Sequence, residues 1–420
     1  MKKTYLGAVA IVVGITMAGC SSNAKASSPK STSSSSTSGS GASTPGTTAT
    51  GTPIKVGLIC TCSGPLAASS PASEHVYEAW ARSVNSSGGI NGHPVTIVAK
   101  DDAANPGTSV AAMTSLLADH VVAIVDLSLL DETWAATVQR AEVPVIGGSP
   151  TETPFYTNPD FYPVGETIDA LPYAFAATAK AAGATSMANF YCAEAAVCQE
   201  TITSITSIGK KLGVPDVYNA SVAFTAPNYT AQCVAAQQAH AGAILNGDVD
   251  SVFKRVAANC NQQGYHPIYV SAGESYDVSM NTATGITDNS WYEGNDLPFF
   301  AANAQVTAMN AAVNKYFPGL VNKPDEWTGG SSVEMWASGL LLEQAVKAGG
   351  LGASGTPTAQ EIIQGLASIN NDTLDGLAPP LTFTSGQPHP IHCWFTFRVQ
   401  HGTPSMVNGG RTTCENGASS

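Results

Sequence analysis

From residue 54 onward, two patterns of apolar and polar positions recur along the chain. Short apolar runs such as 54–59 predict strands, whereas Val76, Trp80 and Val84 recur at the four-residue spacing of one helix face. Gly88 and Gly89 predict the end of that helix. In the same way, strands are predicted at 95–98, 121–125 and 144–147, and helices at 108–117 and 131–140.

A second series of the same kind follows Leu171 and Pro172. Because strands that alternate with helices form right-handed βαβ units, we expect an α/β fold with mainly parallel sheets covered on both faces. Two series of similar length predict two similar lobes. The second series comprises strands at 187–191, 217–222, 243–246 and 268–270, helices at 195–211, 229–240 and 249–263, and then helices at 302–317, 331–348 and 358–368.

The first 20 residues have the pattern of an export signal. Lys2 and Lys3 precede an apolar stretch at 6–17, which is shorter than the about 20 residues that cross a bilayer. Cys20 follows Ala18 and Gly19, and this arrangement resembles the lipobox of bacterial lipoproteins, in which the cysteine is acylated. We therefore expect a signal peptide at 1–20 and a lipid anchor on Cys20. Ordinary secretion with an incidental cysteine is the alternative.

Residues 21–53 are rich in Ser, Thr, Gly and Pro and contain almost no bulky apolar side chains. Such a segment cannot bury enough surface to offset its loss of conformational entropy. The sequence therefore predicts a disordered linker between the anchor and the folded part, with a root-mean-square reach of roughly 30 Å.

Length and charge restrict the function further. A chain of 420 residues is too long for one core and suits two lobes. Its formal net charge is −13, with no basic stripe, so nucleic acid is not an expected partner. No GxSxG, HExxH or P-loop pattern is present, and we expect neither enzymatic activity nor a cofactor.

The chain contains nine cysteines, and eight remain when Cys20 is assigned to the lipid. An even number in an exported chain favours disulfides over metal ligands, although eight cysteines allow 105 pairings. A metal site of His389 and His392 near Cys393 is the alternative, but no CxxC or HExxH spacing supports it. Proximity in sequence favours the pairs Cys192–Cys198, Cys233–Cys260 and Cys393–Cys414, which leaves Cys60 and Cys62 for each other.

Four short motifs in order carry a family resemblance: Ser63-Gly64-Pro65, Gly88-Gly89-Ile90-Asn91-Gly92, Asp101-Asp102 and Asn105-Pro106. Over about residues 54–400 the chain resembles the type I periplasmic binding proteins of the branched-chain amino-acid (Leu/Ile/Val) group, which feed ABC importers. The resemblance implies two Rossmann-like lobes joined by a three-strand hinge, the Venus-flytrap architecture. It divides the chain into lobe 1 at 54–168 plus 298–380 and lobe 2 at 169–297 plus 381–416.

The resemblance also implies ligand contacts from the first lobe. The turn after the fourth strand binds the ligand carboxylate in the family through backbone N–H groups and a hydroxyl, which selects Ser149 and Thr151 here. An ordinary polar turn is the alternative. The loop after the third strand selects Ser128, while Asp131 and Glu132 in the same loop are better explained as residues at a helix start.

From the second lobe, the resemblance selects Glu274 to hold a ligand ammonium, with a solvated loop residue as the alternative. Asp248 and Tyr276 are further cleft candidates. No metal site is expected.

Together these features predict a monomeric, extracytoplasmic solute-binding lipoprotein. It would capture a small polar, amino-acid-like ligand and deliver it to an ABC permease in the cytoplasmic membrane. The alternative is a ligand-sensing receptor domain that signals through a membrane partner, because fold alone does not separate the two functions.

Overall fold

The computed structural model describes residues 49–63, 72–194, 196–323, 327, 329–350 and 355–417. The predicted signal peptide, Cys20 and most of the predicted linker lie outside these residues, as do Gly64 and Pro65. Residues 46–420 form one compact unit. In the described part of the chain, no helix is both long enough and apolar enough to cross a membrane.

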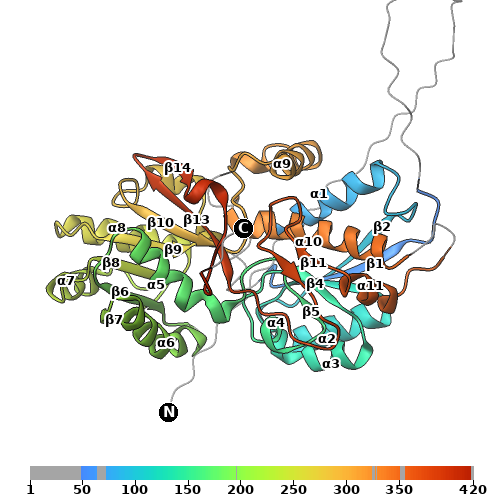
Figure 1. Cartoon of the computed structure of the whole chain (residues 1–420), viewed down its shortest axis with the longest axis horizontal. Coiled ribbons are helices and arrows are strands. Elements are labelled where there is room, and N and C mark those ends of the chain that lie inside the picture. Colours follow the sequence, from blue (N-terminus) through green and yellow to red (C-terminus); the bar gives the residue numbers. More distant parts are fainter. Residues whose placement is uncertain are drawn as a thin grey trace, which may run out of the picture. The chain divides into compact units, whose positions relative to one another are not determined.

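The first sheet is entirely parallel and has the strand order β2-β1-β3-β4-β5. Helices cover both of its faces: α1 and α10 pack on one side, and α2 and α3 on the other (Figure 1). Double coverage explains why β3 and β4 are buried along their whole length. The strands are β1 (Ile54–Cys60), β2 (Val95–Asp101), β3 (Ala123–Leu127), β4 (Val145–Gly148) and β5 (Phe161–Tyr162), and the helices are α1 (Ser73–Ser86), α2 (Pro106–Ala118), α3 (Ala135–Ala141), α4 (Pro154–Thr157), α9 (Ala304–Tyr316), α10 (Gly329–Ala348) and α11 (Ala359–Leu366).

The second sheet has the order β14-β13-β10-β9-β8-β6-β7, with β15 paired to β13. Its strands from β6 to β10 are parallel, and β13 joins β10 in the antiparallel direction. The strands are β6 (Met187–Cys192), β7 (Asp216–Val222), β8 (Ala243–Gly247), β9 (Ile268–Ala272), β10 (Ser290–Gly294), β13 (Cys393–Gln400), β14 (Thr403–Met406) and β15 (Thr413–Cys414), and the helices are α5 (Leu171–Ala181), α6 (Ala196–Leu212), α7 (Thr230–Gln238) and α8 (Asp250–Gln262). A separate short pair is formed by β11 (Asn370–Asp372) and β12 (Leu381–Thr382).

The parallel parts of the two sheets have the same topology. Counted from its own first strand, each sheet runs in the order 2-1-3-4-5. Open sheets of this order bind ligands beyond the carboxyl ends of the strands, at the point where the strand order reverses. The mixed α/β architecture with parallel sheets therefore agrees with the predicted fold class, and it directs attention to the loops after the strands.

Three segments of chain connect the two sheets, at 163–170, 295–303 and 383–392. The first and third are hydrogen-bonded to each other: the N–H of Thr167 donates to the carbonyl of Ile391 over 3.0 Å, and the N–H of Ile391 donates to Thr167 Oγ1 over 3.0 Å. Gly165 lies so close to Asn295 that a Cβ at this glycine would come within 2.6 Å of the Asn295 Cβ. The number of connections is the one expected for a two-lobed clamp, while the lobe boundaries given above remain a prediction.

Gly148 sets the geometry at the end of β4. Its φ of +95° is unfavourable for residues with a side chain, and a Cβ here would lie 1.8 Å from the carbonyl oxygen of Asp126. A glycine at this position therefore lets the end of β4 approach β3 and turn into the Ser149–Thr151 segment.

The structure contains four disulfides, in the pairs that the sequence predicts: Cys60–Cys62, Cys192–Cys198, Cys233–Cys260 and Cys393–Cys414. Cys233 on α7 and Cys260 on α8 are both fully buried. This bridge closes the longest loop of the four, with a sequence separation of 27.

We expect the double variant Cys233→Ala/Cys260→Ala to lose about 3.5 kcal/mol of unfolding free energy, because the cross-link restricts the unfolded chain in proportion to the logarithm of loop length. Removing the Cys192–Cys198 bridge, with a separation of only 6, should cost about 2 kcal/mol. Denaturant unfolding of both variants measures the difference. A Cys233→Ala/Cys260→Ala protein as stable as its parent would contradict this assignment.

Candidate functional site

A cavity of about 340 Å³ lies among the loops that follow the strands of both sheets. We call it the cleft. Leu127 ends β3, Ser149–Thr151 follow β4, and the first connecting segment supplies Glu166 to Ile168. From the second sheet come residues at the ends of β6, β8, β9 and β10: Cys192, Gly247, Asp248, Ala272, Glu274 and Asn295. The cavity therefore occupies the position that the sheet topology predicts for a ligand.

Acidic side chains dominate the charge of the cleft. Glu166, Asp248 and Glu274 line it, and none of the described residues that line it is Lys, Arg or His. Three further carboxyl groups, those of Glu293, Asp296 and Glu334, are buried behind this lining. We call Glu166, Glu274, Glu293, Asp296 and Glu334 the acid cluster.

Asn295 organises part of the acid cluster. Its backbone N–H donates to Glu274 Oε1 over 3.2 Å, and its side-chain Nδ2 donates to Glu334 Oε1 over 2.7 Å. One residue after β10 thus ties an acid at the end of β9 to an acid on α10. Both carboxylate oxygens of Glu166 lack a hydrogen-bond partner among the described residues, although its side chain is only 2% exposed.

Burial raises the pKa values of these carboxyl groups. The pKa of Glu166 rises to about 8, chiefly because burial disfavours the charged form, with a further increase from the charge of Glu274. The pKa values of Glu293, Asp296 and Glu334 lie well above their usual range for the same reason. Burial also raises the pKa of Glu274, and that of Asp248 to about 6. Without a bound cation, several of these groups therefore hold a proton at neutral pH.

Four of the six ligand contacts predicted from the sequence line the cleft: Ser149, Thr151, Asp248 and Glu274. The backbone of the Ser149–Thr151 turn is less available than expected. The N–H of Ser149 donates to the carbonyl of Asp126, and the N–H of Thr151 donates to the carbonyl of Ser149, each over 2.9 Å. Pro150 has no N–H to donate, so this turn presents hydroxyl groups, and Thr151 Oγ1 has no partner among the described residues.

Ser128 and Tyr276, the other two predicted contacts, are not among the residues that line the cleft. Ser128 is fully buried, and its Oγ donates to Asp102 Oδ2 over 2.5 Å. The Tyr276 ring packs against Phe397 in an aromatic cluster, and its hydroxyl donates to Asn281 Oδ1 over 2.9 Å. Both side chains thus have structural partners elsewhere in the fold.

The predicted helix-start acids, Asp131 and Glu132, also lie apart from the cleft lining. Asp131 is fully buried beside Asp126 and Glu132 is exposed, at the start of a short 3-10 turn. Burial, reinforced by the Asp126 charge, raises the pKa of Asp131 well above its usual range. Both acids lie in the first turn of this 3-10 helix, as predicted for residues at a helix start, although its N-cap residue is Leu130.

Sequence reasoning missed Glu166 and Asn295, which both belong to segments that connect the sheets. The only local signal is Gly165 before Glu166, a glycine required by the close approach to Asn295.

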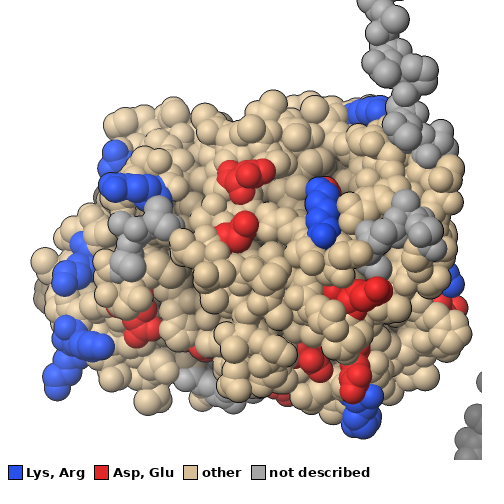
Figure 2. Space-filling view, turned by 45° about the vertical axis from the view of Figure 1, so that its right-hand side comes forward, with Lys and Arg blue, Asp and Glu red and all other residues tan. Residues whose placement is uncertain are grey.

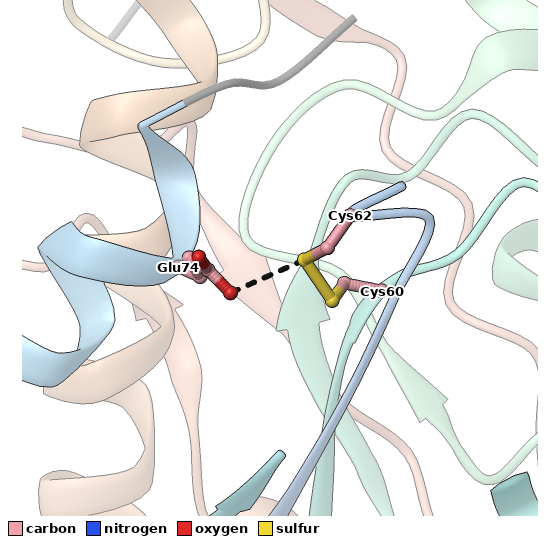
Figure 3. Close-up of side chains that lie close together, drawn as sticks. All are labelled: Cys60, Cys62 and Glu74. Carbon is pink, nitrogen blue, oxygen red and sulfur yellow. Dashed lines mark hydrogen bonds between the residues drawn. A yellow bond between two sulfur atoms is a disulfide. The ribbon is translucent and has the colours of Figure 1, made fainter. Parts of the chain in front are cut away.

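Cys60, Cys62 and Glu74 have atoms close enough together to hold a metal ion, and Figure 3 shows the Glu74 carboxylate directed at the Cys62 sulfur, 3.2 Å away. Both sulfurs are bonded to each other, however, and a metal ligand must be a thiolate. In the alternative metal site near Cys393, the possible ligands also have other partners. His392 pairs with Asp169 over 2.8 Å, and Cys393 is disulfide-bonded to Cys414.

One face of the exterior differs from the cleft in its charges. On the face drawn in Figure 2, the acidic and basic side chains are scattered and most of the surface is uncharged. This face therefore has no concentration of acids like that of the acid cluster.

Comparison with known proteins gives one family. The model of the family described as periplasmic binding protein matches residues 53–404. No curated protein sequence matches the chain.

Solved structures with similar folds include three solute-binding proteins. A fatty acid ABC transporter substrate-binding protein from Thermomonospora curvata is 15% identical with a TM-score of 0.69, over 87% of this chain and 93% of that one. An ABC transporter solute-binding protein from R. palustris in complex with benzoate is 14% identical with a TM-score of 0.68, over 87% and 98%. A leucine-binding protein from Thermotoga maritima is 15% identical with a TM-score of 0.65, over 86% and 99%. At these identities the likeness shows the fold.

Proposed function

Because the chain belongs to the periplasmic binding protein family, whose members bind solutes outside the cytoplasm, we propose that its cleft captures a small organic ammonium ion and presents it to an ABC importer. We infer the ligand class from one observation. Glu166, Asp248 and Glu274 line the cleft, and no described lining residue is basic. A carboxylate in a site of low dielectric pairs strongly with a cation through charge-assisted hydrogen bonds.

A ligand with a carboxylate is the weaker candidate for this cleft. The names of the similar proteins mention a fatty acid, benzoate and leucine, all of which carry one. Here the turn of Ser149 and Thr151 offers hydroxyl groups, because its backbone N–H groups bond internally. A ligand carboxylate would also be repelled by any ionised member of the acid cluster. An amine whose other end is uncharged avoids both problems.

Within this proposal, each polar residue has a separate role. Glu274 and Glu166 accept hydrogen bonds from the ammonium group, and Asp248 adds a third negative charge at the same cavity. Asn295 holds Glu274 through its backbone N–H and so fixes the direction of that carboxylate. Ser149 and Thr151 bind a neutral polar atom at the opposite wall, which belongs to the first sheet.

Delivery to an importer and anchoring through Cys20 are parts of the same proposal. The family supports the first, and the lipobox-like segment supports the second. A tethered binding protein keeps its captured ligand near the membrane that contains the permease.

We expect n-butylamine to raise the melting temperature of the protein by mass action and to give a measurable calorimetric affinity, whereas butyrate of the same size should do neither. Glu274→Gln keeps the shape and removes the charge, so it should weaken n-butylamine by at least about 1.5 kcal/mol. The exposed Glu132→Gln is a matched control that should bind like the parent.

Two results would overturn this proposal. Stabilisation by butyrate without stabilisation by n-butylamine would assign the cleft to carboxylates. Tighter binding of leucine than of n-butylamine would return the ligand to the amino acids that the family resemblance implies.

A further inference from the structure

A second, smaller cavity of about 70 Å³ lies between α5 and α6, and we call it the side pocket. It shares wall residues with the cleft, so the two cavities are adjacent. The shared residues are Ile168, Leu171, Phe175, Cys198 and Gly247. Beyond them the side pocket is lined by Pro172, Thr201, Ile205 and two residues of β6, Asn189 and Tyr191.

The walls of the side pocket are apolar. Phe175 and Ile205 are each 2% exposed and belong to one core cluster packed on the second sheet. Two of the polar side chains at the wall have other partners: Asn189 Nδ2 donates to Asn219 Oδ1 over 3.3 Å, and Thr201 Oγ1 donates to the Cys198 carbonyl over 2.8 Å. Water in such a space finds few hydrogen bonds, so an apolar group that displaces it gains free energy.

The size of the side pocket selects the shape of that group. A dry cavity that admits benzene has a volume of about 150 Å³, roughly twice that of the side pocket. A six-membered ring is therefore too large for the side pocket, and an unbranched alkyl chain is the apolar group that we expect it to take.

We propose that the ligand is an n-alkylammonium compound, with its charged nitrogen at Glu166 and Glu274 and its alkyl chain in the side pocket between α5 and α6. This inference rests on the proposed function and specifies the substrate class of the same site. It also explains why the cleft combines acids with an apolar wall of Leu171 and Phe175.

Calorimetry with n-alkylamines from methylamine to octylamine tests the proposal on the unaltered protein. Each methylene that enters the side pocket should tighten binding about fourfold, because burying one is worth about 0.8 kcal/mol. The gain should stop when the pocket is full, and cyclohexylamine should bind less tightly than n-hexylamine. Equal affinities along the series, or tighter binding of cyclohexylamine, would overturn the side-pocket assignment.

A matched pair of variants on α6 locates the effect. Thr201→Leu places a larger side chain at the pocket wall, so it should abolish the dependence of affinity on chain length. Thr203→Leu makes the same change at an exposed position two residues along and should behave like the parent. If Thr201→Leu keeps the full chain-length dependence, the side pocket is not the binding place and the proposed function stands. If no amine binds the parent protein, the proposed function itself fails.

Discussion

Raising the pH from about 5 to about 8 should destabilise the ligand-free protein, lowering its melting temperature by on the order of 10 °C. The acid cluster is the reason. Burial raises the pKa of Glu166 to about 8 and moves those of Glu293, Asp296 and Glu334 well above their usual range. Each unit of a pKa shift is worth about 1.4 kcal/mol, so the shift of Glu166 alone amounts to several kcal/mol.

The sign follows from the direction of the shifts. In the unfolded chain these carboxyl groups lose their protons near their ordinary pKa of about 4.3, whereas in the folded protein they retain them to a higher pH. Their stabilising contribution is therefore complete below the unfolded value and is lost as the pH rises toward the folded one. Asp277 and Asp101 have lowered pKa values, and their contributions disappear only at pH values below the window of this experiment.

Thermal unfolding monitored by circular dichroism at several pH values measures this effect. Glu334→Gln removes one of the buried groups while leaving the Asn295 Nδ2 donor with an oxygen to bond, so it should flatten the profile. The exposed Glu132→Gln should leave the profile unchanged. A melting temperature that rises between these pH values would refute the assignment of protons to the cluster.

Most elements could be predicted from sequence because their apolar residues follow a single period. Two exceptions are informative. Helix α5 begins at Leu171-Pro172, a proline-containing pair that predicts a boundary between elements and not a helix. A proline in the first turn does not destabilise the helix, because the N–H that it lacks would have no partner there. Strand β10 is not predicted from the sequence because its five residues include Glu293, a buried acid that interrupts the apolar run.

The candidate site could be predicted only in part, for a related reason. Glu274 and Ser149 follow strands, and the ends of parallel strands point to one edge of a sheet, so their location can be inferred. Glu166 and Asn295 lie in segments that connect the sheets, and their approach to the cleft depends on packing between distant parts of the chain. Tyr276 shows the opposite error, since its position after a strand is right but its ring packs into the aromatic core.

Affinity for an alkylamine should increase about tenfold between pH 6 and 7 and less steeply between pH 7 and 8, and Glu166→Gln should remove this dependence. The amine itself stays protonated in this range, because an alkylammonium resembles the Lys side chain with a pKa of about 10.4. Glu166, whose pKa is raised to about 8, must lose its proton before it can pair with the cation. At pH 6 only about one molecule in a hundred is competent in this respect, and the apparent affinity falls by that fraction.

The charged groups that face Glu166 determine its pKa and therefore the pH range over which the affinity changes. Glu274 after β9 and Asp169 raise the pKa of Glu166 through their charges, while the neighbouring Glu293 from β10 and the charge of His392 before β13 lower it. His392 itself has a raised pKa because Asp169 bonds its ring, so it remains partly charged above its ordinary value and opposes the effect of the acids. Calorimetry with n-butylamine at pH 6, 7 and 8 separates the contributions, with Asp169→Asn as the variant that weakens the histidine charge. The same slope in Glu166→Gln as in the parent would assign the proton to another member of the acid cluster, and a flat profile in the parent would mean that the ammonium group binds elsewhere in the cleft.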